Sequence, residues 1–398
     1  MKLSYPNYDK NTLKRVRNVL KSGRVNYWTG DECKRFEKEF SKSIGNKYAI
    51  TVSNGSVALE LALKTLNLKK NDKIIVSPRS FIISASCVLN LGLKPVFADV
   101  DQNGNMSIEG IKKSYNKNVK AIIVVHLNGL SCDLNPILKF VKQKKIFLIE
   151  DCSQAHGAKY KGKKVGSFGH ISTWSFCQDK IISTGGEGGM ISTNQQKLWH
   201  KLWSLKDHGK NYHSCFVKKH QIGFKWLHDY LGSNYRMTEM QAAIGREQLK
   251  SLPRQIKKRN AIANLYLNGL KEFYNKYDIL KKPDFQCQTC PFKKNEQLCN
   301  QCTHSFYRLN LFINKKKIKQ TKLIQDLNEN KISCGIGSCP EIYKEKIFRT
   351  LKIYPKKRLP NAKFLGETSI MFPINPNIAL SKIKFEINSL KQILKKYL

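Results

Sequence analysis

Lys180 is the residue whose neighbours in the sequence most favour covalent chemistry. It lies between apolar residues and a turn with four glycines at 185–189, and Ser175 precedes it by five positions. Partial desolvation beside other cations favours the neutral form of a lysine amine, which is the form that attacks a carbonyl group to give a Schiff base. The chain has 71 lysine and arginine residues, so it is this neighbourhood, and not the lysine alone, that makes Lys180 a candidate nucleophile.

Two further segments contain side chains that suit a phosphorylated cofactor. The run IFLIED at 146–151 places Asp151 at the end of an apolar strand, where a carboxylate can pair with a protonated ring nitrogen. Asn54, Gly55 and Ser56 lie where a helix begins, and the free amides and the dipole of a helix N-terminus favour phosphate. Each feature also has an ordinary interpretation, because Asp, Asn and Ser cap helices and turns.

The elements that must position these residues follow an α/β pattern. Apolar runs rich in Ile, Val and Phe, without polar alternation, occur at 74–77, 95–100, 121–126 and 146–151. Such runs are typical of strands that are buried on both faces. Helical patterns lie between them, which predicts a mostly parallel, doubly wound sheet with its ligand site beyond the carboxyl ends of the strands.

The sequence also predicts two domains. Beyond about Trp199 the pattern changes to long, lysine-rich helical stretches and then to a mixed C-terminal third, which indicates a second, smaller α+β domain. We place a large domain with the N-terminal helices at 1–250. The small domain spans residues 251–398 and contains a cysteine-rich insertion at about 285–303.

The composition is strongly basic, with a formal net charge of +42. The lysines are spread along the chain instead of being concentrated in a tail or an arm, which favours a solvated surface or attraction of an anionic small substrate over a nucleic-acid footprint. Hydrophobic residues make up 41% of the chain, and no charge-free apolar stretch is long enough for a membrane span. We therefore expect a soluble protein, and the absence of an apolar signal-peptide core near Met1 predicts the cytoplasm.

Four cysteines have the spacing of a metal knuckle. Two C-x2-C pairs are separated by eight residues and consist of Cys287, Cys290, Cys299 and Cys302. Each pair can direct two thiolates at one ion, so the arrangement predicts a closed, structural zinc site. An iron–sulfur cluster, disulfides and unliganded thiols are the alternatives.

The segments that begin at Ser53, Glu150 and Trp174 together resemble the DegT/StrS family of sugar aminotransferases. These enzymes carry pyridoxal phosphate on the fold-type I scaffold. Further similar segments, in the same order along nearly the whole chain, begin at Ser80, His126, His156, Leu231 and Leu365. The resemblance therefore implies a fold-type I transferase with a large sheet domain and a smaller C-terminal α+β domain.

The resemblance assigns chemical roles to three residues. Lys180 is expected to form the Schiff base with the cofactor, and Asp151 to pair with its pyridine nitrogen. Gln154 is expected to hydrogen-bond its phenolic oxygen.

The resemblance also assigns contacts with the phosphate and the ring of the cofactor. Gly55, Ser56 and Ser175 are expected to bind the phosphate. Phe81 is expected to stack on one face of the ring, with Ser153, where relatives usually have Ala, against the other face. Together with Lys180, Asp151 and Gln154, these residues come from four separate segments of the chain.

Asn234 is expected to reach the phosphate of the neighbouring subunit's cofactor, which implies a homodimer with shared sites. Another departure from the family is Asn128, where relatives often carry an aromatic residue. Arg236 and His208 are candidate partners for an anionic substrate.

The function implied by the resemblance is transfer of an amino group, with glutamate as donor, to a nucleotide-linked keto sugar in amino-sugar or surface polysaccharide biosynthesis. Two alternatives differ from it. A cofactor-dependent sugar dehydratase carries His where Lys180 stands, and a non-catalytic, zinc-containing regulator or nucleic-acid-binding protein would fit the charge and the cysteines. The sequence does not specify the sugar or the carbon that receives the amine.

Overall fold

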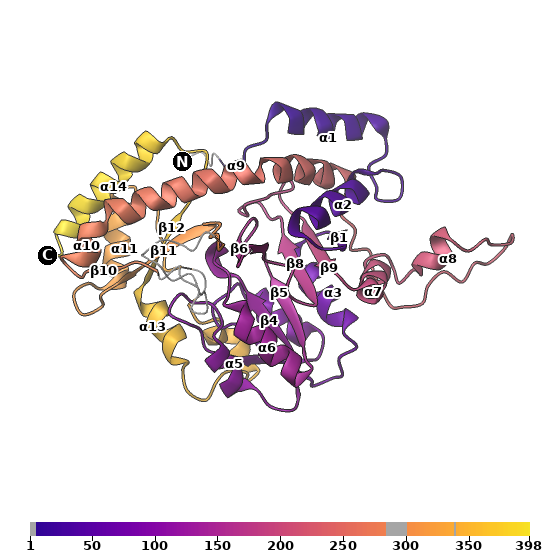
Figure 1. The fold of residues 1–398 in the computed structure, drawn as a ribbon, viewed down its shortest axis with the longest axis horizontal. Coiled ribbons are helices and arrows are strands. Elements are labelled where there is room, and N and C mark those ends of the chain that lie inside the picture. Colours follow the sequence, from indigo (N-terminus) through magenta and orange to yellow (C-terminus); the bar gives the residue numbers. More distant parts are fainter. Residues whose placement is uncertain (1–4, 284–300, 338–339) are drawn as a thin grey trace.

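The computed structural model describes residues 5–283, 301–337 and 340–398. A large sheet domain and a smaller domain lie at opposite ends of the molecule, and the long helix α9 (Glu239–Gly269) runs from one to the other (Figure 1). The helix begins with a capping box in which Thr238 and Gln241 exchange hydrogen bonds, which satisfies amide groups that the first turn would otherwise leave unpaired.

The large domain is built on a seven-stranded sheet of order β1-β9-β8-β5-β4-β2-β3. All strands run in one direction except β9, which is antiparallel to both of its neighbours, β1 and β8. The strands are β1 (Tyr48–Val52), β2 (Lys73–Val76), β3 (Lys94–Phe97), β4 (Val119–Val125), β5 (Phe147–Asp151), β8 (Ile171–Ser175) and β9 (Gly189–Thr193). The four strands predicted from apolar runs are thus β2 to β5, and the mostly parallel sheet is confirmed.

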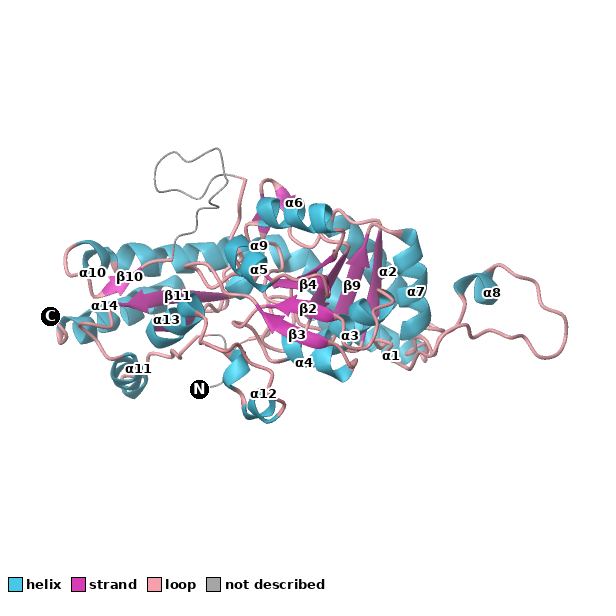
Figure 2. Ribbon diagram, turned by 90° about the horizontal axis from the view of Figure 1, so that it is seen from below, coloured by secondary structure: helices cyan, strands magenta, loops and turns pink. Residues whose placement is uncertain are grey.

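Helices cover both faces of this sheet (Figure 2). One apolar cluster joins the sheet to α2 (Glu32–Ile44), α5 (Ile108–Ser114) and α6 (Leu134–Lys144). The other cluster joins it to α3 (Gly55–Thr65), α4 (Ile83–Asn90) and α7 (Gln196–Lys206). Because both faces are covered, residues in the middle of the strands are buried on either side, which explains their lack of polar alternation.

Helix α1 (Lys10–Ser22) packs on α9 at one side of the large domain. The segment after α7 forms an arm, residues 211–233, that carries the short helix α8 (Tyr212–Phe216) and projects away from the body of the molecule (Figure 1). A small hairpin, β6 (Lys159–Tyr160) with β7 (Lys163–Lys164), and the turn η1 (Leu127–Gly129) complete the large domain.

The smaller domain has a three-stranded antiparallel sheet and its own apolar core. Its strands are β10 (Leu280–Lys281), β11 (Arg308–Ile313) and β12 (Ser369–Pro373), and its helices are α10 (Lys271–Asn275), α11 (Gln320–Glu329), α13 (Pro360–Thr368) and α14 (Leu380–Lys395). The turn η2 (Ile342–Lys344) and helix α12 (Lys346–Thr350) pack on the large domain instead, because their buried residues Ile342, Tyr343 and Phe348 belong to the apolar cluster of α3, α4 and α7. The core takes in the C-terminal half of α9, including Ile262 and Tyr266. The division at 250/251 falls inside α9 and stays a prediction.

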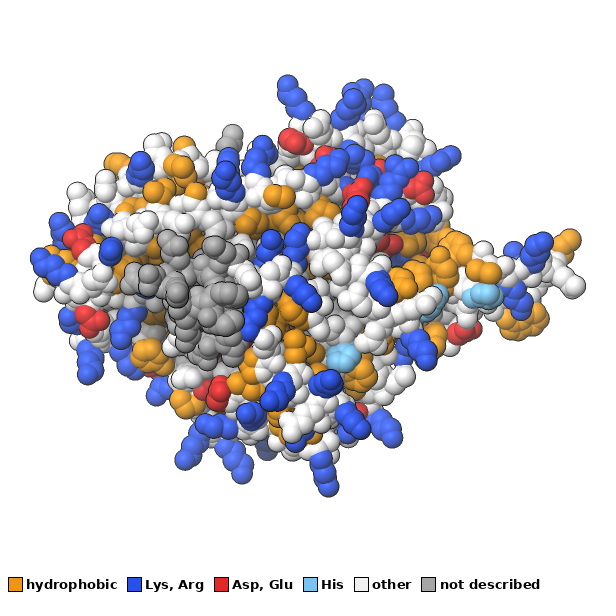
Figure 3. Space-filling model, viewed as in Figure 1, with side chains coloured by type: hydrophobic (Ala, Val, Ile, Leu, Met, Phe, Trp, Pro, Cys, Tyr) orange, Lys and Arg blue, Asp and Glu red, His pale blue; other side chains and the backbone are white. Residues whose placement is uncertain are grey.

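Basic side chains are scattered over the visible face of the molecule and do not gather into one stripe (Figure 3). Among the described residues, no helix combines the length and the apolar character needed to cross a bilayer.

Candidate active site

The ends of two neighbouring strands define the centre of the candidate site. Asp151 is the last residue of β5 and Ser175 is the last residue of β8. The two strands run parallel, with Asp151 opposite Thr173, so both side chains lie at the carboxyl edge of the sheet. This is the edge at which open α/β sheets bind their ligands.

Asp151 presents a buried carboxylate that is held from two sides. Its Oδ1 accepts a hydrogen bond from the amide of Ser153 at 3.0 Å, and its Oδ2 accepts one from the hydroxyl of Ser84 at 3.5 Å. The residue is only 4% exposed. A carboxylate fixed in this way keeps acceptor capacity for one more donor. Ser84, on α4, was missed by sequence reasoning because it has no local signal.

The phosphate-binding residues predicted at the start of α3 lie against the end of β8. A Cβ built on Gly55 would stand 2.6 Å from the Cβ of Ser175, so only glycine allows this approach. The Asn54 side chain caps the helix by accepting the amide of Val57 at 2.9 Å. Ser56 follows in the first turn and is partly buried, so the free amides, two hydroxyls and the helix dipole meet at one place.

Gln154 is fixed by the turn that follows β4. Its side-chain oxygen accepts the backbone amide of Asn128 at 2.8 Å. Asn128 has a φ of 56°, a left-handed conformation that Asn tolerates well. Because the contact uses the backbone, it does not require the aromatic side chain that relatives often carry at this position.

Lys180 has a different environment from the one expected. Its side chain is 16% exposed. The amine lies 3.2 Å from the hydroxyl of Tyr307 and 3.5 Å from Oδ1 of Asp179. Burial acts to lower the pKa of this amine, but the Tyr307 phenol and the Asp179 carboxylate outweigh burial and raise it above the usual lysine value. The expected desolvation is thus present, but an adjacent phenol and carboxylate, which the expectation did not include, outweigh its effect on the amine.

Of the other predicted residues, Phe81, Asn234 and His208 are exposed, whereas Arg236 is largely buried. Phe81, in the turn that leads into α4, is 63% exposed, and Asn234 is exposed beyond the arm. Arg236 donates to the buried Oδ1 of Asp207 at 2.8 Å, so it is already paired with an acid. His208 is exposed, with a φ of 57°.

A buried polar network lies behind the site, on the opposite face of β5. Glu150 accepts the Nε2 proton of His126 at 3.0 Å, and His126 Nδ1 accepts the amide of Cys132 at 3.1 Å. The Glu150 carboxylate also accepts three backbone amides, those of Gly166, Phe168 and Gly169. Cys152 lies close enough to join His126 and Glu150 as a metal ligand, but these hydrogen bonds already occupy both nitrogens of His126.

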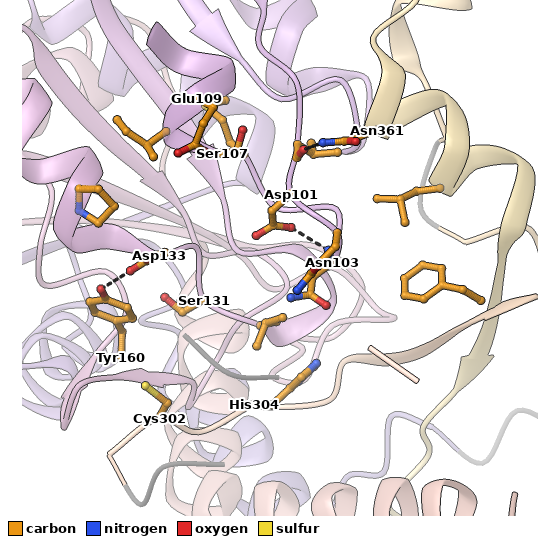
Figure 4. A pocket seen from close by; sticks show the side chains of 18 of the residues that line it. Asp101, Asn103, Ser107, Glu109, Ser131, Asp133, Tyr160, Cys302, His304 and Asn361 are labelled. Carbon is orange, nitrogen blue, oxygen red and sulfur yellow. Dashed lines mark hydrogen bonds between the residues drawn. The ribbon is translucent and has the colours of Figure 1, made fainter. Parts of the chain in front are cut away.

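A separate cavity of about 800 Å³ lies between the loop after β3, the loop after η1 and the small domain (Figure 4). Asp101 accepts the amides of Asn103 and Asn105 there, and burial raises the pKa of Asp101 to about 6. Lys180 and Asp151 are not among the described residues that line it, so this cavity is distinct from the candidate site.

Cys302 also lines this cavity, and its thiol accepts the amide of Lys161 at 3.4 Å. The other three cysteines of the predicted knuckle, Cys287, Cys290 and Cys299, lie outside the described residues.

The fold is that of a fold-type I, pyridoxal-phosphate-dependent transferase. The chain belongs to the DegT/DnrJ/EryC1/StrS aminotransferase family, whose model matches residues 6–391. The resemblance inferred from the sequence is thereby confirmed.

Individual relatives agree with this assignment. An aminotransferase from Psychrobacter cryohalolentis superposes with a TM-score of 0.93 at 41% identity, over 99% of this chain and 98% of that one. GDP-perosamine synthase of Escherichia coli O157:H7 is 40% identical over 242 residues, which are 61% of this chain and 64% of the relative. An Escherichia coli GDP-4-keto-6-deoxy-D-mannose-3-dehydratase with bound hydrated PLP superposes with a TM-score of 0.83 at 28% identity, over 98% of this chain and 99% of that one.

Proposed function

We propose that the chain transfers an amino group from glutamate to a nucleotide-linked keto sugar, with pyridoxal phosphate as cofactor. The observation that carries the proposal is that Asp151 and the Gly55–Ser175 contact lie at one edge of the sheet in a fold of this family, with the mostly buried Lys180 on the turn that follows β8. The names of relatives such as GDP-perosamine synthase support a sugar as acceptor.

The residues at the sheet edge fit the cofactor. The start of α3 and the hydroxyls of Ser56 and Ser175 would hold the phosphate, and the close approach at Gly55 keeps that position free of a side chain. Asp151 would accept the proton of the ring nitrogen, and Gln154 would hydrogen-bond the phenolic oxygen. When bound, the protonated ring acts as an electron sink for the carbon that loses a proton.

Phe81 and Ser153 would enclose the cofactor ring from its two faces. The exposed phenyl group of Phe81 provides a surface on which an aromatic ring can stack. Ser153 has a small side chain and donates its amide to Asp151, so it leaves room on the other side.

Lys180 would hold the cofactor covalently and, once released, move protons with its Nζ at the carbon that bears the amine. A lysine at this position also argues against the dehydratase alternative, in which His replaces it. The dehydratase relative has the same fold, so fold alone does not separate the two reactions.

A panel of nucleotide-linked keto sugars, incubated with the loaded enzyme and ¹⁵N-glutamate, tests the proposal. We expect one keto sugar to become a ¹⁵N-labelled amino sugar, with formation of 2-oxoglutarate in equal amount. A deoxygenated sugar without nitrogen would instead show a dehydratase.

We also propose that the enzyme is a homodimer with shared sites, in which Asn234 reaches the cofactor phosphate of the partner subunit. The support is the exposure of Asn234 together with the apolar arm before it, where Ile222, Phe224, Trp226 and Leu231 are each more than three quarters exposed. Apolar patches of this kind mark interaction surfaces, and a second copy would cover the arm.

Mixing inactive Lys180→Ala protein with inactive Asn234→Ala protein tests the shared site. After subunit exchange, one of the two sites in each heterodimer carries both native residues, so part of the activity should return. A fully active monomer in light scattering would contradict this arrangement.

A structural zinc ion held by Cys287, Cys290, Cys299 and Cys302 is a further part of the proposal. Besides the spacing, its support is the amide of Lys161 that donates to the Cys302 thiol, since ligating groups are commonly hydrogen-bonded by a second set of residues. We expect about one zinc per chain, as a four-thiolate site requires. Cys302→Ser should release the zinc and Cys334→Ser, outside the motif, should retain it. Iron with visible charge-transfer bands would favour a cluster.

A further inference from the structure

Tyr307 and Asp179 form a hydrogen-bonded pair on the amine of Lys180. Lys180 and Asp179 are consecutive residues of the large domain, whereas Tyr307 immediately precedes β11 of the small domain. The Lys180 amine lies 3.2 Å from the phenol oxygen and 3.5 Å from the carboxylate. The phenol also donates to the other carboxylate oxygen of Asp179. Two domains therefore contribute to the surroundings of one amine.

The direction of these hydrogen bonds follows from the donors available. A phenol has one proton, and Tyr307 gives it to Asp179. Tyr307 must therefore accept from Lys180, so the chain of hydrogen bonds runs from lysine to tyrosine to aspartate. Arg308 stabilises its acidic end, because its guanidinium lies 3.4 Å from Asp179 and 4.6 Å from the centre of the Tyr307 ring.

The backbone at Lys180 is held independently of this pair. The hydroxyl of Tyr5 lies 2.5 and 2.8 Å from the carbonyl oxygens of Lys180 and Ile181, which share its one proton. Tyr307 itself is 5% exposed, and the turn at Gly129, whose carbonyl accepts the amide of Ser305 at 2.9 Å, supports the segment before it. The contact between Tyr307 and Lys180 thus orients the amine alone, not the main chain.

We propose that Tyr307 is a further catalytic residue, which accepts a hydrogen bond from the Lys180 amine whenever that amine is not bonded to the cofactor, and that Asp179 is the positioning residue that orients the phenol. The proposal rests on the proposed role of Lys180. Tyr307 forms no covalent bond and gives up no proton. It keeps the released amine in one orientation while Nζ takes up and returns the substrate proton.

A consequence is that the small domain takes part in catalysis through one hydroxyl group. Lys180 comes from the turn after β8, and Tyr307 comes from the edge of β11. A displacement of the small domain by about 1 Å would lengthen the hydrogen bond, and misplacement on this scale can cost about a hundredfold in rate.

Tyr307→Phe, Asp179→Asn and the matched control Tyr266→Phe test the proposal. Tyr266 is a buried tyrosine of the small-domain core whose hydroxyl donates to Glu386 at 2.5 Å, away from Lys180. The first readout is the pKa of the Lys180 amine in the cofactor-free protein, measured by competitive acetylation and peptide mass spectrometry. It should fall in Tyr307→Phe and in Asp179→Asn and stay unchanged in Tyr266→Phe. The other titratable groups that interact with this amine, Cys177 and His156, are the same in all variants.

The second readout is single-turnover kinetics of the loaded enzyme with glutamate. We expect a rate about tenfold to a hundredfold lower in Tyr307→Phe, with an apparent affinity for glutamate within about twofold of the native value. An unchanged pKa of Lys180 in Tyr307→Phe would overturn the hydrogen bond, and an unchanged single-turnover rate would overturn the catalytic role. Borohydride labelling of a different lysine would instead refute the proposed function, while the pKa measurement on Lys180 would still test the pair.

Discussion

Replacing Glu150 by Gln should destabilise the protein strongly, because this carboxylate holds together three segments of the large domain. The side chain is fully buried. One of its oxygens accepts the amides of Phe168 and Gly169, at 2.8 and 2.6 Å. The other accepts the amide of Gly166 at 2.8 Å and His126 Nε2 at 3.0 Å.

The magnitude follows from counting donors. Glutamine keeps the shape of the side chain, but its NH₂ group must face one of the two donor pairs, whichever way the amide is turned. Two buried donors then lose their acceptor, at a cost of about 1–3 kcal/mol each. His126 cannot compensate by moving its proton to Nδ1, since that nitrogen accepts the amide of Cys132. For two such donors we expect a loss of about 2–6 kcal/mol.

Urea unfolding followed by circular dichroism, at matched protein concentration, measures this loss. The control is Glu367→Gln, because Glu367 is 37% exposed and pairs with Lys315 and Arg358 at the surface. It should cost no more than about 1 kcal/mol. If Glu150→Gln cost as little as the control, the network would not hold the segments together.

The pH dependence of stability provides a second check on Glu150. Burial acts to raise the pKa of this carboxyl, but the hydrogen bonds from His126 and the backbone amides outweigh burial and lower it. The folded pKa thus lies below the unfolded one, so the stabilisation is present above the unfolded pKa and is lost as the pH falls through the folded pKa. The decrease in the free energy of unfolding on acidification should therefore be smaller in Glu150→Gln than in the native protein.

Three further predictions concern other residues. Asp151→Asn should lower the transamination rate by several powers of ten, as measured by stopped-flow, with little change in cofactor affinity, because the electron sink weakens; near-native turnover would contradict the role of Asp151. Gly55→Ala should weaken cofactor binding in fluorescence titrations, since its Cβ would stand 2.6 Å from Ser175, whereas Gly335→Ala has open space and should not. Burial lowers the pKa of Lys206 to about 8, so the native protein should gain up to about 3 kcal/mol relative to Lys206→Met between pH 8 and 10.5; parallel pH profiles would refute this.

The sheet and its site edge could be predicted from the sequence because both leave local signals. Strands buried on two faces have continuous apolar runs, and Asp151 stands directly at the end of one. The start of α3 was likewise visible in the order Asn54, Gly55, Ser56. Their spatial meeting follows from the rule that parallel strands end at one edge.

The surroundings of Lys180 could not be predicted in the same way. Tyr307 lies 127 residues from Lys180 in the sequence and has no motif of its own, so only the packing of the small domain reveals the contact. Asp179 is adjacent to Lys180 in the sequence, so its carboxylate is the one local feature that could have indicated an acid beside the amine. Ser84, which binds Asp151 from another helix, had no such signal.

The central claim is that Lys180 carries the cofactor of a sugar aminotransferase, and reductive trapping tests it most directly. The loaded enzyme would be treated with borohydride, digested and mapped by peptide mass spectrometry, with Lys180→Ala protein as the control. We predict the reduced pyridoxyl group on Lys180 and no specific label in the control. A label on a different lysine, or equal labelling of Lys180→Ala protein, would contradict the assignment.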